Sequence, residues 1–373
     1  MKLQRHGAVV AFLAAGALLV AGCGSDPTPA GGGAGAPAAG GSSAVDCTGK
    51  KNLTAEGSSA QKNAIDAFIQ AYQAACAGSN VAYNPTGSGA GVKQFNAGLV
   101  DFGGSDSALS KDKGEVDAAA KRCQGNPAWN LPLVFGPVAL TYKLNGVTDL
   151  TLNGEVAAKL FNGGITTWND PAIAALNPGK TLPAVPVKVV YRSDESGTTD
   201  NVQQYLTAAS KGAWTQGAGK KFAGGVGSGA EKSAGVAQAT AATEGAVSYV
   251  ELSFAQDAKL SIAKIDSGSG AVELNTANVG KAIEGAKVTG TGNDLVIDLK
   301  GVYGAPAAGS YPLILATYEI VCSKGYDADT AKAVKAFLTT AATTGQASLA
   351  DAGYAPLPAS FQAKLTTAIN AIS

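Results

Sequence analysis

The sequence predicts an α/β fold, because segments with strand character alternate with amphipathic segments along most of the chain. The chain has 373 residues, of which 46% are hydrophobic and 15% are charged, so it can fill a large core. A chain of this length usually divides into two domains. We therefore expect an ordered α/β protein with two domains, and we exclude a wholly disordered chain.

The individual elements follow from hydrophobic periodicity. The first strand is expected at 51–55 and the first helix at 60–76, with Ser58 or Ser59 as its N-cap. The later elements are, in chain order, a helix at 91–99, an apolar stretch at 131–144, a strand at 185–192 that runs through 193–199 into a helix ending near 208, a helix at 232–243, a strand at 246–252, a helix at 275–283, a strand at 314–322 and helices at 328–340 and 360–372. The sequence contains no internal repeat.

The N-terminus predicts export. Lys2 and Arg5 precede an apolar run at 7–20, which is too short for a comfortable membrane span. A basic start followed by such a run is typical of a secretory signal peptide, here residues 1–22.

The end of this signal peptide predicts a lipid anchor. Leu19-Val20-Ala21-Gly22-Cys23 resembles the lipobox of bacterial lipoproteins, in which the cysteine is acylated and becomes the first residue of the mature protein. Residues 23–46 are rich in Pro, Ala, Gly and Ser, a composition typical of a flexible tether. The resemblance implies that Cys23 is lipidated, for example with palmitate, and holds the protein on the extracytoplasmic face of the cell membrane.

Charge and histidine content exclude several function classes. The chain has 28 basic and 28 acidic residues, so no basic excess is available to neutralise a nucleic-acid backbone. The only histidine is His6, within the predicted signal peptide. Histidine-based catalytic triads and histidine metal sites are therefore not expected in the mature protein.

Four cysteines follow Cys23, and an even count in an exported protein predicts two disulfides. Sequence alone permits three pairings. Cys47 lies just before the first predicted strand and Cys76 at the end of the helix that follows, and an antiparallel helix returns its end to the start of the strand. This geometry favours Cys47 with Cys76, which leaves Cys123 with Cys322.

Glycine-rich stretches in this chain do not have nucleotide-loop or hydrolase spacing. Gly179-Lys180-Thr181 lacks the upstream glycine of a P-loop, and no Gly-x-Ser-x-Gly turn occurs. Short Ser/Thr/Gly clusters instead recur where a strand leads into a helix, at 57–60, 87–89 and 195–198. A single cluster of this kind is an ordinary N-cap, but three of them, with Arg192 directly before the third, predict an anion pocket.

The segments 54–60, 86–92, 101–106 and 192–198 resemble, in order and spacing, the four ligand segments of the PstS-type phosphate-binding lipoproteins of phosphate ABC transporters. The similarity extends from about Cys47 to the C-terminus. It implies a two-lobed periplasmic-binding-protein fold of the Venus-flytrap kind, type II, with the ligand cleft between the lobes. Residues 47–143 and 304–373 would form lobe I and residues 144–303 lobe II, joined by two hinge crossovers.

Carrying the family's phosphate contacts onto matching positions gives a candidate ligand set. It consists of Ser59, Ala60, Ser88, Asp106, Arg192, Ser196, Gly197 and Thr198. Ser59 stands where threonine is common in the family, and Ala60 where a bulkier residue is usual. A hydroxyl and a backbone N–H are retained at these two positions, so the implied chemistry is unchanged.

The chemistry of the ion agrees with this set. Phosphate at neutral pH is largely HPO₄²⁻, so its site needs more donors than acceptors. Three helix N-termini at about +0.5 each and Arg192 sum to roughly +2.5, against −2 for the ion and −1 for Asp106, so no metal or other cofactor is expected. Asp106 would accept a hydrogen bond from P–OH, although it also reads as an N-cap for a helix at 107–111. Asp194 would support Arg192 by holding its guanidinium in position.

The sequence thus predicts a non-enzymatic protein that binds inorganic phosphate with high affinity outside the cytoplasm and delivers it to an ABC-type import permease and its ATPase. We expect a monomer without a nucleic-acid partner. The first alternative is a binder of another tetrahedral oxyanion, such as sulfate or molybdate. A phosphate-ester hydrolase with a serine nucleophile is the second, and the absence of a histidine base and of metal ligands argues against it.

Overall fold

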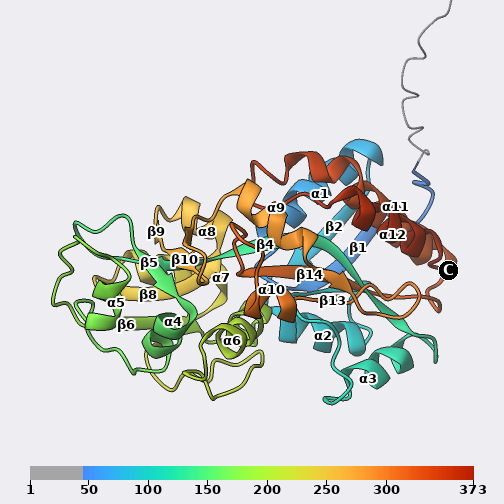
Figure 1. The fold of residues 1–373 in the computed structure, drawn as a ribbon. Helices are drawn as coiled ribbons and strands as arrows, with labels where there is room; N and C mark the ends of the chain where they lie inside the picture. The colour runs from blue at the N-terminus through green and yellow to red at the C-terminus, as the bar shows by residue number, and fades with distance from the viewer. Residues whose placement is uncertain (1–44) are drawn as a thin grey trace, which may run out of the picture. The chain divides into compact units, whose positions relative to one another are not determined.

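The computed structural model describes residues 45–373, in which strands and helices alternate along the chain (Figure 1). The predicted signal peptide at 1–22, the predicted lipidation site Cys23 and most of the predicted tether at 23–46 lie outside the described residues. Within residues 45–373, every helix is too short or too polar to span a bilayer.

A mixed sheet of nine strands forms the centre of this structure. In order across the sheet the strands are β2 (Asn80–Asn84), β1 (Asn52–Gly57), β3 (Phe102–Ser105), β14 (Ile314–Cys322), β4 (Ala128–Tyr142), β8 (Ala246–Glu251), β6 (Lys188–Arg192) and β7 (Ser228–Ala230), and β9 (Ser261–Ile262) also pairs with β4. Strands β2, β1 and β3 are parallel to one another, as are β8, β6 and β7. Carboxyl ends of parallel strands meet at the same edge of a sheet, so each set brings its following loops together.

Strand β4 connects two groups of strands. Its residues 128–137 pair antiparallel with β14, and its residues 138–142 pair antiparallel with β8. We call β2, β1, β3 and β14 the first strand group, and β8, β6 and β7 the second strand group. The long apolar stretch of the sequence is therefore part of one strand that pairs with both groups.

Smaller strands complete the sheet structure. β5 (Thr151–Asn153), β10 (Lys264–Asp266) and β11 (Ala271–Val272) form one small sheet, and β12 (Lys287–Val288) and β13 (Ile297–Asp298) form a hairpin. The N–H of Leu295 donates to the carbonyl of Asn130 at 3.0 Å, and the N–H of Ile297 to the hydroxyl of Tyr318 at 3.0 Å. This hairpin therefore hydrogen-bonds to β4 and β14.

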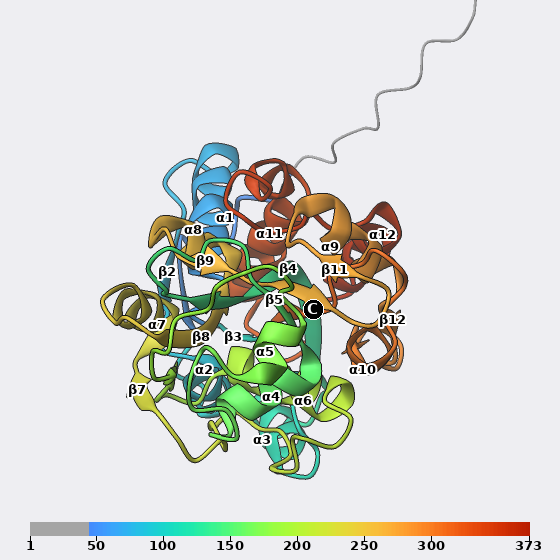
Figure 2. The same cartoon turned by 60° about the vertical axis from the view of Figure 1, so that its left-hand side comes forward.

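Helices cover both faces of the sheet. In chain order they are α1 (Lys62–Ala75), α2 (Ser88–Asn96), α3 (Glu115–Arg122), α4 (Gly154–Phe161), α5 (Pro171–Ala175), α6 (Gly197–Ala209), α7 (Lys232–Ala241), α8 (Leu252–Asp257), α9 (Thr276–Glu284), α10 (Lys300–Gly304), α11 (Ala328–Ala342) and α12 (Ala359–Asn370), with a 3₁₀ turn at Thr344–Ser348. In Figures 1 and 2, α1, α11 and α12 lie on one side of the first strand group and α2 and α3 on the other.

Aromatic contacts fill the core on both strand groups. Phe337 of α11 packs edge-on against Tyr72 at 5.6 Å and stacks on Phe102 at 5.3 Å between ring centroids. On the second strand group, Phe161 of α4 packs edge-on against Tyr249 of β8 at 5.6 Å. Such pairs stabilise packing beyond their buried area, by about 0.5–1.5 kcal/mol each.

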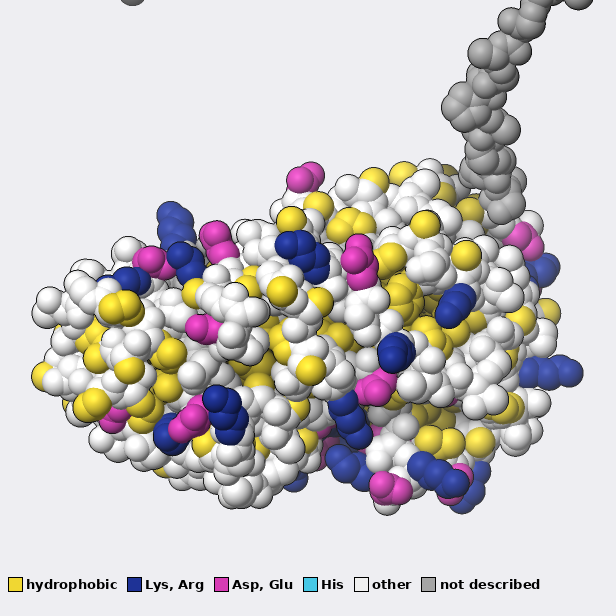
Figure 3. Space-filling model, viewed as in Figure 1, with side chains coloured by type: hydrophobic (Ala, Val, Ile, Leu, Met, Phe, Trp, Pro, Cys, Tyr) yellow, Lys and Arg dark blue, Asp and Glu magenta, His cyan; other side chains and the backbone are white. Residues whose placement is uncertain are grey.

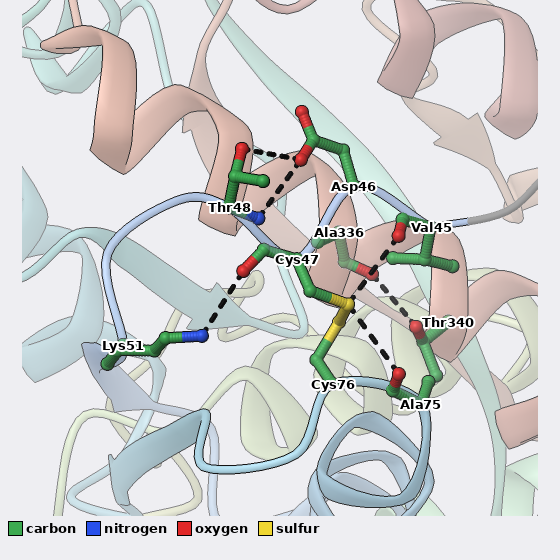
Figure 4. The surroundings of a disulfide bond; sticks show 9 residues. All are labelled: Val45, Asp46, Cys47, Thr48, Lys51, Ala75, Cys76, Ala336 and Thr340. Carbon is green, nitrogen blue, oxygen red and sulfur yellow. Dashed lines mark hydrogen bonds between the residues drawn. A yellow bond between two sulfur atoms is a disulfide. The ribbon is translucent and has the colours of Figure 1, made fainter.

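Both predicted disulfides are confirmed. Cys47 is bonded to Cys76, with 5.4 Å between their Cα atoms, and Cys123 to Cys322, with 5.3 Å. Figure 4 shows the first bond, which joins the segment before β1 to the end of α1 beside α11. The strand-then-antiparallel-helix geometry used for the sequence prediction is therefore the geometry of this unit.

Two helix starts differ from the prediction. Helix α1 begins at Lys62 with Gln61 as N-cap, so neither Ser58 nor Ser59 caps it. The reason is tertiary, because the hydroxyls of both serines hydrogen-bond to residues far away in the sequence. Helix α2 begins at Ser88 rather than at residue 91, since Gly87 with φ of +106° makes the sharp turn that allows the helix to start there.

Candidate functional site

Asp106 follows β3 and is held by three hydroxyl groups. Its side chain is buried, and Oδ1 accepts hydrogen bonds from Ser58 Oγ at 2.5 Å and Thr317 Oγ1 at 2.7 Å. Its Oδ2 accepts one from Ser88 Oγ at 3.0 Å. Residues 107–110 are not helical, so the alternative reading of Asp106 as a helix N-cap is wrong. The carboxylate instead receives donors from the β1–α1 turn, from α2 and from β14.

The environment of Asp106 raises its pKa to about 6. Burial is the main cause, because the charged form loses its hydration. The hydrogen bond from Ser58 lowers the pKa, and the nearby carboxylate of Glu251 raises it. At neutral pH the group is therefore mostly ionised and remains a hydrogen-bond acceptor.

The N-terminus of α6 packs directly against α2 and Asp106. The N–H of Gly197 donates to Ser88 Oγ at 3.1 Å, and the N–H of Gly89 donates to the carbonyl of Glu195 at 2.9 Å. A Cβ atom on Gly197 would lie 2.6 Å from both Asp106 Cβ and Ser88 Oγ. Glycine at 197 is therefore required for this close approach, which brings the first and second strand groups together.

Arg192, the last residue of β6, is buried and paired with Asp194. Its Nε donates to Oδ1 of Asp194 at 2.8 Å and its Nη2 to Oδ2 at 2.5 Å, so the pair is bidentate. Burial raises the pKa of Asp194, but the hydrogen bond and the charge of Arg192 outweigh it and keep that pKa below its usual value. Asp194 thus contacts Arg192 as expected from the sequence, and it leaves Nη1 of the guanidinium to face Thr198 and Ser233.

Thr198 and Ser196 lie at the start of α6. The Thr198 hydroxyl donates to Oε1 of Glu251 at 2.6 Å, and Nη1 of Arg192 lies 3.5 Å from the same hydroxyl oxygen. Ser196 is the N-cap of α6, and its hydroxyl oxygen accepts the N–H of Thr199 at 3.2 Å. The local Ser-Gly-Thr sequence therefore makes a capped helix start beside the guanidinium.

Ser59 and Ala60 occupy the turn between β1 and α1. Ser59 Oγ accepts the N–H of Ser233 at 3.1 Å and lies 3.1 Å from Ser233 Oγ. The N–H of Ala60 donates to Ser58 Oγ at 3.0 Å. This turn consequently reaches Asp106 through Ser58 and the second strand group through Ser59.

The structure brings the predicted residues into two connected clusters. Ser88, Asp106 and Gly197 contact one another directly, and Ala60 joins them through Ser58. Arg192, Asp194 and Thr198 form the second cluster, which Ser59 joins through Ser233. Ser196 caps the helix that carries Gly197 and Thr198.

Five side chains in or beside these clusters were not predicted as site residues. They are Ser58, Ser233, Glu251, Thr317 and Glu319. Ser58 and Ser233 carry a detectable signal, because each is a hydroxyl beside a predicted helix start. Glu251 and Glu319 are acids within apolar strands, and such acids are rarely buried without a specific role.

Glu319 lies in β14 and is fully buried. Burial raises its pKa to about 8; the side chain of Gln61 lowers that pKa, and the charge of Asp106 raises it further. Glu319 is therefore mostly neutral at neutral pH. Of these two carboxyl groups, Asp106 is therefore the one that is mostly ionised.

A polar cavity of about 410 Å³ opens beside Asp106. Asp200 and Asn201 of α6 and Tyr318 of β14 contribute to its lining. The Asn201 side chain also donates to the Asp106 carbonyl at 2.7 Å. The Asp106 side of the site thus borders open space between β14, α6 and the β12–β13 hairpin.

Comparison with known proteins gives consistent matches. The family model described as a PBP superfamily domain matches residues 35–342. Phosphate-binding protein PstS 3 of Mycobacterium tuberculosis is 52% identical over 375 residues, covering 100% of both chains. PstS 2 of the same organism is 50% identical with the same coverage, and PstS of Xylella fastidiosa is 31% identical over 76% of each chain.

Solved structures share the fold. A high-affinity periplasmic phosphate-binding protein bound with phosphate superposes with a TM-score of 0.66 at 24% identity, covering 85% of this chain and 93% of that one. A phosphate-binding protein from Stenotrophomonas maltophilia gives 0.65 at 21%, covering 85% and 94%. The predicted two-lobed α/β fold of periplasmic binding proteins is thereby confirmed. From the family model and the full-length relatives, the chain belongs to the PstS-type phosphate-binding proteins of the PBP superfamily.

Proposed function

We propose that this chain binds inorganic phosphate outside the cytoplasm and delivers it to the permease of an ABC-type importer. One observation carries the proposal: a buried acceptor, Asp106, faces a set of donors from two strand groups at a single site. A protonated dianion needs this combination, because it has one P–OH to donate and three oxygens that only accept.

The donors are arranged for an anion without a surplus of positive charge. Arg192 is the cation of the site, and its bidentate contact with Asp194 offsets its charge. The N-termini of α2 and α6 add partial positive charge and backbone N–H groups at the same place. Attraction of the ion therefore depends on oriented dipoles and hydroxyls as much as on Arg192.

Asp106 Oδ2 is the oxygen we assign to the P–OH group. Oδ1 already accepts hydrogen bonds from Ser58 and Thr317, whereas Oδ2 accepts one from Ser88. The Ser88 hydroxyl has a single proton, and its oxygen accepts the N–H groups of Asp106 and Gly197. Ion binding would turn that proton from Oδ2 to the ion, so that Oδ2 can accept from P–OH.

The remaining contacts follow the assignment made from the sequence. Ser59 would donate its hydroxyl, Ala60 its N–H, and Arg192 its guanidinium. Ser196, Gly197 and Thr198 would donate from the start of α6. The Ala60 N–H now donates to Ser58 Oγ, so its role requires that the Ser58 side chain rotate about χ1 or that this N–H be shared between Ser58 Oγ and the ion.

The ion would be enclosed by closure of two lobes, residues 47–143 with 304–373 and residues 144–303. Ion pairs cross the rim between them, Lys93 with Glu195 at 2.7 Å and Lys220 with Glu115 at 3.1 Å. The β12–β13 hairpin belongs to the second of these residue ranges, but it hydrogen-bonds to β4 and β14, which belong to the first. A hinge measurement should therefore examine the boundary near residue 303 first. Comparison of scattering profiles with and without phosphate tests the closure.

We further propose that the protein is a monomer, has no enzymatic activity and is anchored through lipidated Cys23 to the extracytoplasmic face of the membrane, where it meets the permease and its ATPase. Basic and acidic side chains are interspersed on the face seen in Figure 3, which fits the proposed absence of a nucleic-acid partner. Membrane fractionation of Cys23→Ala tests the anchor, which fails if the variant partitions like the wild type.

Calorimetric titration of the purified chain with phosphate, arsenate and sulfate tests the central proposal. We expect tight binding of phosphate, binding of arsenate because it keeps a proton, and weak binding of sulfate. Equal or tighter binding of sulfate or molybdate would contradict the proposal and favour another oxyanion. Release of phosphate from a phosphomonoester would instead favour the hydrolase alternative.

A further inference from the structure

Ser233 contacts two groups of the proposed phosphate site and belongs to none of its four predicted segments. It is the second residue of α7, which follows β7 directly. Strand β7 runs parallel to β6, and Ala230 pairs with Arg192 in register. Two parallel strands thus deliver Arg192 and the start of α7 to the same edge of the sheet.

The side chain of Ser233 is buried and bridges the two strand groups. Its hydroxyl oxygen accepts a hydrogen bond from Arg192 Nη1 at 3.1 Å. Its backbone N–H donates to Ser59 Oγ at 3.1 Å, and the two hydroxyl oxygens lie 3.1 Å apart. Ser59 and Ser233 are 174 residues apart in the sequence, so this contact is a product of the fold.

Proton counting shows what this pair offers to an anion. Two hydroxyls carry two protons, and one proton is used in the bond between the two oxygens. If Ser59 donates to Ser233, the proton of Ser233 is left; if Ser233 donates to Ser59, the proton of Ser59 is left. In both arrangements the pair has one hydroxyl proton to donate elsewhere.

The start of α7 is also held against the Arg192–Asp194 pair. The N–H of Lys232 donates to Asp194 Oδ1 at 3.0 Å. Lys232 has a φ of +62°, in the left-handed region that side-chain-bearing residues rarely adopt. Such a conformation costs free energy and persists where the surroundings fix it. The chain therefore accepts a strained backbone in order to place Ser233 between Arg192 and Ser59.

We propose that Ser233 is a further phosphate-binding and positioning residue, and that Ser59 and Ser233 act as one unit that donates a single hydrogen bond to the ion. The inference rests on the proposed phosphate-binding function and adds a fifth segment to its site. The N-terminus of α7 then stands as the third helix end of the pocket, in place of α1, which begins two residues beyond Ala60.

The test is a double-mutant cycle of phosphate affinity by calorimetry with Ser59→Ala, Ser233→Ala and the double variant. Ser233→Ala keeps the backbone N–H and removes the hydroxyl, and we expect its phosphate Kd to rise about 3- to 30-fold. Each hydroxyl is held in place by the other, so removing either one misplaces the donor that remains. The double variant should therefore be much less impaired than the product of the two single losses predicts. A purely structural role would not produce this coupling at the ion.

Thr240→Ala is the matched control. Thr240 is a buried hydroxyl of the same helix, and it hydrogen-bonds to Val236 and Ser248 away from the site. We expect this variant to lose thermal stability and to keep the wild-type phosphate Kd. If Ser233→Ala binds phosphate within about twofold of the wild type, or if the two losses simply multiply, the role of Ser233 is overturned. If the wild-type chain itself fails to bind phosphate, the proposed function fails, and the role of Ser233 fails with it.

Discussion

The two ends of the candidate site bury opposite charges in different ways. At the acceptor end, Asp106 receives hydroxyl groups from Ser58, Ser88 and Thr317. At the guanidinium end, Arg192 is joined to a counter-charge, Asp194, by two hydrogen bonds. Hydroxyls compensate a buried carboxylate only partly, so the pKa of Asp106 rises, whereas the pKa of Asp194 falls.

This difference indicates that one end of the site attracts the anion and the other discriminates between anions. At the guanidinium end Arg192 stays charged, and the pKa of Asp194 lies below its usual value, so this end can attract any tetrahedral anion at neutral pH. At the acceptor end, Asp106 has a pKa near neutrality, and its protonation state decides whether it accepts or donates a hydrogen bond. We therefore expect changes at the first end to affect affinity for all anions and changes at the second to affect discrimination.

Removing the guanidinium should give the largest effect. Arg192→Ala takes away the cation of the site and leaves the carboxylate of Asp194 without its partner. We expect the Kd values for phosphate, arsenate and sulfate to rise together, by at least about 100-fold, in calorimetric titrations.

Arg122→Ala is the control for this experiment, because Arg122 lies 4.9 Å from the ring centroids of Phe95 and Tyr326 and outside the candidate site. It should lower stability and leave the phosphate Kd unchanged. A loss of phosphate binding in Arg192→Ala with unchanged sulfate binding would contradict the separation of the two ends.

The guanidinium end is also the part of the site that sequence reasoning described best. Arg192, Asp194 and the capped start of α6 lie within seven consecutive residues, and local rules of strand ends and helix caps apply to them directly. The strand–helix order of the fold was predictable for the same reason, and the two-lobed arrangement came from resemblance to a family.

The acceptor end was less predictable because its partners are distant in sequence. Thr317 is 211 residues from Asp106 and lies in a strand that is buried along its whole length. Ser58 was one of two serines that local propensity offered as the cap of α1, but its hydroxyl donates to Asp106 instead, so tertiary structure overrode the local preference. Contacts of this kind depend on strand register, which a single sequence does not specify.

The second prediction concerns Glu319 at the acceptor end, whose raised pKa should make the free energy of unfolding depend on pH. Below about pH 4.5 the folded and unfolded chains both carry the Glu319 proton. Between pH 4.5 and about 8 the unfolded chain releases it while the folded chain retains it, so the free energy of unfolding falls as the pH rises. At about 1.36 kcal/mol per pKa unit, this loss is on the order of 3–5 kcal/mol.

Chemical denaturation across this pH range should therefore show that Glu319→Gln gains stability relative to the wild type as the pH rises. Its phosphate Kd at neutral pH should stay close to the wild-type value, because both side chains are then neutral. Glu284→Gln, a change at an exposed carboxylate on α9, is the control and should keep the wild-type pH slope. A Glu319→Gln profile parallel to that of the wild type would show that Glu319 is ionised in the folded protein.

A change of Asp106 should alter selectivity more than it alters the fold. Asp106→Asn places a donor where the P–OH group needs an acceptor, so we expect about a 10- to 100-fold loss of phosphate affinity. Sulfate has no proton to donate, and its affinity should hold or improve. Lowering the pH below about 6 should move the wild-type protein in the same direction, because Asp106 then becomes a donor.

The ratio of sulfate to phosphate Kd values is the measurement for this prediction. Asp101→Asn is a matched control. Asp101 is a buried aspartate that directly precedes β3, the strand that Asp106 follows, and its carboxylate contacts Lys50 and Thr54. The control should leave the ratio unchanged. An unchanged ratio in Asp106→Asn would mean that Asp106 does not face the proton of the ion.

We expect the smallest effect from the rim ion pair between Glu115 and Lys220, which lies outside both ends of the site. Glu115 Oε1 pairs with Lys220 at 3.1 Å, and the carbonyl of Lys220 accepts the N–H of Ser196, the cap of α6. Glu115→Gln removes a largely buried ion pair that joins α3 to the guanidinium end. We expect phosphate release in stopped-flow measurements to accelerate about 2- to 5-fold, with little change in the ratio of sulfate to phosphate affinity.

Glu155→Gln is the comparison for this rim pair, because Glu155 pairs with Lys159 four residues along the same helix and links no separate elements. Its release rate should equal that of the wild type. High salt should change the rate of phosphate release less in Glu115→Gln than in the wild type, because the ion pair that salt would screen is absent from the variant. If Glu115→Gln and Glu155→Gln release phosphate at the same rate, the rim pair does not contribute to closure, and retention of the ion depends on the two ends of the site alone.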